Sequence, residues 1–115
     1  MIDTRLEVIN GLKTIGLPVY AEHFICSDTD TPCISYRLTN DIQEKTGENI
    51  MYGSQYYSIK LYSRGIKDTA EYGKQIDKVM REMGFTRIAT NHTWITNYCL
   101  DEFKYLGKTI EYMEE

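Results

Sequence analysis

Residues 31–84, TPCISYRLTNDIQEKTGENIMYGSQYYSIKLYSRGIKDTAEYGKQIDKVMREMG, decide the fold of this chain. Their pattern predicts a strand over 33–39, a polar loop over 40–54, a second strand over 55–63 and a helix over 68–83. Two strands followed by a helix with one apolar side are typical of a sheet that is covered on one face.

The second strand shows the period of two that marks a half-covered sheet. The residues expected to face the core are Tyr57, Ile59 and Leu61. The residues expected to face away are Tyr56, Ser58, Lys60 and Tyr62. The sheet is therefore expected to keep an aromatic outer face for solvent or for another subunit.

The predicted loop over 40–54 is too long for a tight hairpin, and loops of this length are usually functional or disordered. Its charged residues keep it solvated, and its apolar residues are candidate anchors for a partner. These anchors are Ile42, Ile50, Met51 and Tyr52.

Both predicted helices carry recognisable end signals. The helix over 68–83 has Asp68 as its predicted N-cap and Gly84 as its stop. The helix over 3–15 begins with Thr4 and Glu7 as a capping box, or with Asp3 as the alternative cap.

The remaining elements are predicted to be short. Strands are expected over 19–21, 85–89, 93–97 and 104–112, with a polar turn at Asp101-Glu102. The whole order predicts one α+β domain over 1–115, with a mostly antiparallel sheet of about four strands and two helices on one face.

Composition narrows the functional class. The chain has 115 residues, 17 acidic and 13 basic side chains and a net charge of −4. Neither a signal peptide nor a membrane-spanning run is present, so we expect the chain to stay in the compartment where it is made. An acidic chain without a basic stripe on its strands is not expected to bind nucleic acid as its main ligand.

Chemical motifs are sparse, and we expect neither catalysis, a metal nor a cofactor. A base at His92 acting on Cys99 is the one nucleophilic arrangement considered, and a turn histidine beside Trp94 is the favoured alternative. The carboxylate pairs Asp28/Asp30, Asp101/Glu102 and Glu114/Glu115 are interpreted as ordinary turn and terminal residues. A disulfide between Cys26 and Cys33 is disfavoured, because three widely spaced cysteines are typical of reduced thiols.

The outward tyrosines allow two interpretations. Tyr56 and Tyr62, with Lys60 between them, match either a subunit interface or a platform on which bases of single-stranded nucleic acid stack. The subunit interface is favoured, because the net negative charge of the chain disfavours binding to the phosphates of nucleic acid. The candidate interface residues are Ile42, Ile50, Met51, Tyr52, Tyr56, Lys60 and Tyr62.

The chain also resembles a known family. The capped first helix, TPCISY at 31–36, YSIKLYS at 57–63 and the helix that follows resemble the tail-completion proteins of long-tailed bacteriophages. Asp101-Glu102 before a closing strand with Thr109-Ile110-Glu111 fits their usual ending. These are patterns of strand and helix type that cover nearly the whole chain.

This resemblance implies a structural protein of the virion tail or neck, assembled in the bacterial host cytoplasm. Such a protein forms a commonly hexameric ring at the head-proximal end of the tail tube, stops tube growth and joins the tail to the head connector. Its implied partners are further copies of itself, the tail-tube protein and the connector, while DNA only passes through the lumen. The alternative is a small α+β module that binds a ligand or nucleic acid.

Overall fold

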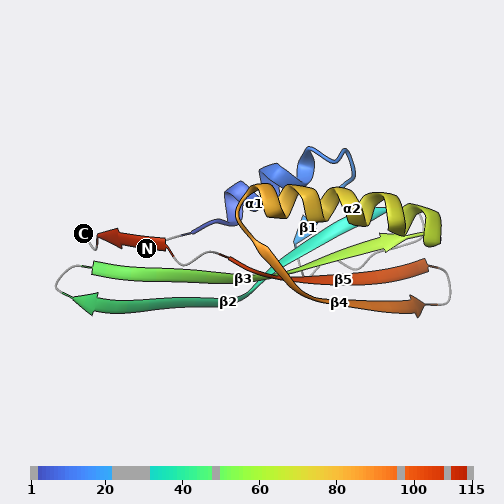
Figure 1. Cartoon of the computed structure of the whole chain (residues 1–115). Helices are drawn as coiled ribbons and strands as arrows, with labels where there is room; N and C mark the ends of the chain where they lie inside the picture. Colours follow the sequence, from blue (N-terminus) through green and yellow to red (C-terminus); the bar gives the residue numbers. More distant parts are fainter. Residues whose placement is uncertain (1–2, 22–31, 48–49, 96–97, 108–109, 114–115) are drawn as a thin grey trace.

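Two helices lie on one side of a mostly antiparallel sheet in the computed structural model, which describes residues 3–21, 32–47, 50–95, 98–107 and 110–113 (Figure 1). The described elements are α1 (Arg5–Lys13), β1 (Val19–Ala21), β2 (Cys33–Gly47), β3 (Ile50–Ser63), α2 (Ile66–Glu82), β4 (Thr86–Ile95), β5 (Tyr98–Leu106) and β6 (Ile110–Met113). The α+β class is thereby confirmed.

The strands lie in the order β1-β2-β3-β5-β4, and β6 pairs with the first residues of β3. The β1–β2 pair is parallel, and every other described pair is antiparallel. The described sheet thus exceeds the expected count of about four strands. The two short strands expected over 85–89 and 93–97 are one strand, β4, because the polar residues between them pair with β5.

The prediction of a loop over 40–54 is wrong. Its described residues form the far half of a β2–β3 hairpin, with Asn40 opposite Tyr56 and Gly47 opposite Ile50. Because β2 and β6 flank β3 on its two sides, the strands satisfy backbone groups that a loop would leave to water. This pairing outweighs the weak strand propensity of the polar residues.

The predicted turn at Asp101-Glu102 is also wrong, because β5 runs straight through both residues. Asp101 lies opposite His92 on β4, and the strand ends at Leu106 instead of continuing to residue 112. The chain leaves the strand at Gly107, whose amide donates to the Gln55 carbonyl at 2.7 Å. Cross-strand partners for the acidic side chains therefore override their preference for turns.

The core lies between the helices and the sheet. Its buried members are Val8, Leu12, Ile34, Tyr57, Ile59, Leu61, Ile76, Met80, Phe85, Phe103 and Tyr105. The three core residues expected from β3 are confirmed, since none is more than 1% exposed. Helix α2 begins after Gly65 as its N-cap, so Asp68 is an acidic residue of the first turn and not the cap. The stop at Gly84 is confirmed by its φ of 93°.

The outer face of the sheet carries no described helix (Figure 1). Tyr56, Lys60 and Tyr62 are half-buried there, as the alternation of β3 requires. Ser58 also faces outward as expected, but it is only 3% exposed, and its hydroxyl donates to Glu102 Oε2 at 2.6 Å. The outer face is thus uncovered by helices but partly closed by its own polar contacts.

Candidate functional site

The structure brings six of the seven candidate interface residues to the outer face of the sheet. Alternation along β3 places Ile50, Tyr52, Tyr56, Lys60 and Tyr62 on this face, and Ile42 joins them opposite Ser54. Met51 is the exception, because it alternates with the buried side of β3 and lies opposite Lys45. Met51 therefore lies on the opposite side of the hairpin from the other candidate residues.

The far half of the hairpin extends beyond both helices as an arm (Figure 1). We define the arm as residues 40–47 of β2, residues 50–54 of β3 and strand β6. The molecule measures 53 Å along its longest axis and 23 and 22 Å across it. Of the six candidates on the outer face, Ile42, Ile50 and Tyr52 lie on the arm, and Tyr56 lies just beyond its end.

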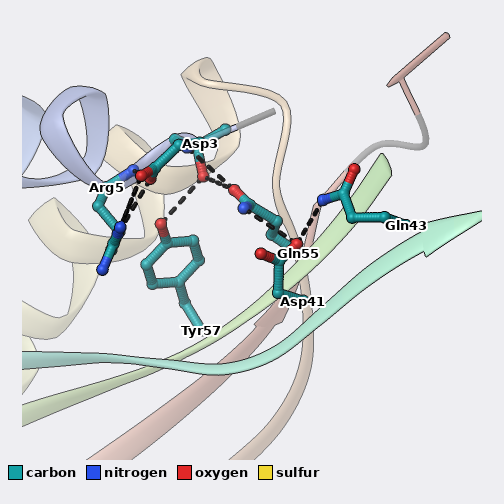
Figure 2. A network of polar contacts seen from close by, with 7 residues as sticks. Asp3, Arg5, Asp41, Gln43, Gln55 and Tyr57 are labelled. Atoms are coloured by element: carbon teal, nitrogen blue, oxygen red, sulfur yellow. Dashed lines mark hydrogen bonds and ion pairs between the residues drawn. The ribbon is translucent and has the colours of Figure 1, made fainter. Parts of the chain in front are cut away.

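A chain of hydrogen bonds ties the base of the arm to the start of α1 (Figure 2). The Thr4 amide donates to Gln55 Oε1 at 3.0 Å, and the Thr4 hydroxyl contacts both this oxygen and the Tyr57 hydroxyl. Gln55 Nε2 in turn donates to Asp41 Oδ1 at 3.3 Å. The arm is therefore braced at its root by a side chain of β3 that is 3% exposed.

Sequence reasoning missed this brace, because Thr4 and Gln55 are 51 residues apart. Thr4 stands at the N-cap position without capping the helix by its side chain. The predicted capping box is therefore wrong, and Asp3, the residue before the N-cap, accepts the Arg5 amide with its Oδ1 at 3.0 Å. Hydrogen bonds from Arg5 lower the pKa of Asp3 to about 2. Burial raises the pKa of the Tyr57 hydroxyl at the inner end of the brace.

Three cations and one carboxylate lie on neighbouring strands of the outer face. Arg37 and Lys104 flank Ser58 across neighbouring strands, and Lys60 lies opposite Glu102. Hydrogen bonding from Ser58 lowers the pKa of Glu102, with smaller contributions from Asn91, Lys104 and Lys60. This cation cluster of Arg37, Lys60 and Lys104 draws on three different strands, so the pattern of any single strand does not reveal it.

The one arrangement considered for catalysis does not activate its nucleophile. His92 Nδ1 lies 2.5 Å from Asp101 Oδ1, and Cys99 is on the same strand as Asp101. Burial and the charge of Asp101 raise the pKa of the Cys99 thiol, so it stays protonated near neutral pH. A nucleophilic cysteine requires the opposite shift.

The described residues hold no cluster of three or more His, Cys, Asp or Glu side chains that a metal ion would need. None of the described helices combines the length and the apolar character needed to cross a membrane. Cys26 and the carboxylate pairs Asp28/Asp30 and Glu114/Glu115 lie outside the described residues.

No protein-family model matches this chain, and no curated protein matches it either.

Proposed function

We propose that this protein is a structural assembly protein of the tail-completion type in long-tailed bacteriophages. The observation that carries the proposal is an arm that continues directly into a sheet face without a covering helix, with tyrosines along both. Tyrosine is enriched in protein interfaces because its ring buries apolar area while its hydroxyl keeps a hydrogen bond. The resemblance of the sequence supplies the biological setting.

In this proposal, copies of the chain close into a ring at the head-proximal end of the tail tube, in the virion neck. The ring blocks further addition of tail-tube protein and presents a docking surface to the head connector. Closure is heterologous, because the surface used on one copy meets a different surface on the next copy. DNA passes through the lumen without sequence readout, and the acidic chain keeps it from adhering.

Replacing Tyr56 and Tyr62 together with serine is expected to leave the fold intact and to abolish ring formation and tail joining. Both side chains are half-buried on the outer face and outside the core cluster, so their loss removes contact area from a partner. Electron microscopy of tails mixed with the variant measures the fraction of completed tails.

The matched control is Leu6→Ser on α1, because Leu6 is 70% exposed and lies on the helix side of the molecule. This control should complete tails as the natural protein does. Normal tail completion by the double tyrosine variant, with its melting temperature unchanged, would contradict the role of the outer face.

The cation cluster favours a second candidate, a module that binds single-stranded nucleic acid. Tyr56 lies beside Arg37 and Lys104 on one groove of the outer face, the combination that stacks bases and holds phosphates. Against it, Glu102 lies in the same groove and repels phosphate. This candidate predicts a salt-dependent anisotropy change with a labelled oligonucleotide, and the absence of binding at low salt would eliminate it.

A further inference from the structure

The sheet ends in an exposed edge strand that carries few charges and two exposed large apolar side chains. Strand β4 is the last in the strand order, and its only described strand partner is β5. Eight of its nine residues from Thr86 to Trp94 are exposed, and the large side chains of Ile88 and Trp94 are 55% and 68% exposed. The strand contains no proline, and Arg87 is its single residue with a permanent charge. Proteins normally protect a long open edge with prolines and charges, so an edge without them is suited to strand addition.

A groove runs beside this edge on the helix side of the sheet. It separates the flank of α2 from β4, and it reaches Phe103 of β5. Its cationic residues are Lys74 and Arg87, and Ile66 at the start of α2 is 82% exposed. Among the described residues that line the groove, Asp77 is the one acidic side chain, and it is engaged by Tyr105, Arg81 and Arg87. The groove therefore offers a net positive rim next to apolar side chains.

The arm carries the opposite charge and a second open edge. The arm as defined holds Asp41, Glu44 and Glu111 against Lys45, a net charge of −2. Strand β1 pairs with β2 only along Ile34, Ser35 and Tyr36, so no described strand pairs with that edge along the arm. Asn40 and Glu44 are exposed there. The acidic arm and the basic groove lie on different parts of the molecule, so the arm of one copy can contact the groove of another.

We propose that the arm of one copy docks along β4 and the α2–β4 groove of the next copy, adding β2 to the open edge. This contact is heterologous, as ring closure in the proposed function requires, and the inference rests on that function for its setting only. Opposite charges on arm and groove fix the direction of docking and disfavour contacts between two arms or two grooves.

The test is a charge exchange between two variants of the whole chain. The groove variant, Lys74→Glu with Arg87→Glu, has an acidic groove that repels the acidic arm of another copy. The arm variant, Asn40→Lys with Glu44→Lys, has a basic arm that is repelled by the basic groove of another copy. Each variant alone is expected to lose about 100-fold in self-association by sedimentation velocity. An equimolar mixture should assemble again, because each groove then finds an arm of opposite charge.

A matched control exchanges charges on α1, far from the groove: Glu7→Lys with Lys13→Glu, both at exposed positions. This control should assemble as the natural chain does. Where the double groove variant fails to fold, Lys74→Glu alone replaces it, since Lys74 is exposed and lies outside the Asp77 contacts. Amide exchange should slow along β4 and residues 40–47 on assembly.

Three results would overturn the docking: either variant alone self-associating as strongly as the natural chain, a mixture that stays monomeric, or a natural chain that is monomeric at millimolar concentration. The proposed function fails separately. Recovery of assembly in the mixture without any effect of the variants on tail joining would reject the phage role and keep the docking. Tails completed normally by a groove variant that still self-associates like the natural chain would reject the docking and keep the role.

Discussion

Replacing Tyr57 with alanine should lower the free energy of unfolding by about 3–5 kcal/mol, as large aromatic deletions in cores do. Tyr57 is 1% exposed and sits in the core between the helices and β3. Its ring packs edge-on against Phe85, with centroids 5.4 Å apart and planes at 87°. Its hydroxyl also holds Thr4 at the start of α1, at 2.9 Å. The substitution therefore opens a cavity and releases one end of the arm brace.

Tyr57→Phe separates these two effects. It keeps the ring contact and removes only the hydroxyl, so a loss of about 1 kcal/mol is expected from the missing hydrogen bond. Urea unfolding followed by circular dichroism measures both variants. Equal losses for the alanine and phenylalanine variants would show that the hydroxyl, and not the packing of the ring, holds this part of the core.

Replacing Gly107 with alanine should cost about 2 kcal/mol of stability, because the added methyl group has no room. A Cβ at this position would lie 2.9 Å from the Gln55 carbonyl oxygen and 3.0 Å from the Phe85 ring. The oxygen belongs to the backbone of β3, and it already accepts the Gly107 amide at 2.7 Å. Neither neighbour is a flexible side-chain end, so the strand itself must shift.

Gly47→Ala is the matched control, since a Cβ there meets only Ile50 side-chain atoms at 3.8 and 3.9 Å. Its stability should stay within about 0.5 kcal/mol of the natural chain. Thermal unfolding of both variants compares the two glycines directly. A Gly107→Ala variant as stable as the control would mean that the exit from β5 is looser than the close approach to Gln55 indicates.

The arm changes the physical interpretation of the candidate residues. As a loop, residues 40–54 would have to become ordered on contact with a partner, at a cost in conformational entropy. As a braced hairpin, their described part is already ordered by β3, β6 and the Thr4–Gln55–Asp41 contacts. A preorganised arm loses less entropy on docking, which favours assembly through weak repeated contacts.

Local patterns were sufficient for much of this fold. The alternation of β3 identified its core face, because side chains of a strand point to opposite sides whatever the strand pairs with. The apolar stripe of α2 identified its buried residues Ile76 and Met80, because the helical repeat is equally local. Gly84 marked the end of α2, since few other residues adopt its positive φ. These signals depend on neighbouring residues alone.

The arm, the buried Asp101 and the cation cluster depended on tertiary structure. Polar residues 40–47 became a strand only because β3 pairs with them, and Asp101 stayed in a strand because His92 faces it. Arg37, Lys60 and Lys104 came together because the strand order sets β2, β3 and β5 side by side. Amino-acid order determined where helix α2 and the second half of β3 lie and which side each of them buries. Strand pairing joins residues that are far apart in the chain. It decided where the cation cluster, the open edge of β4 and the α2–β4 groove lie.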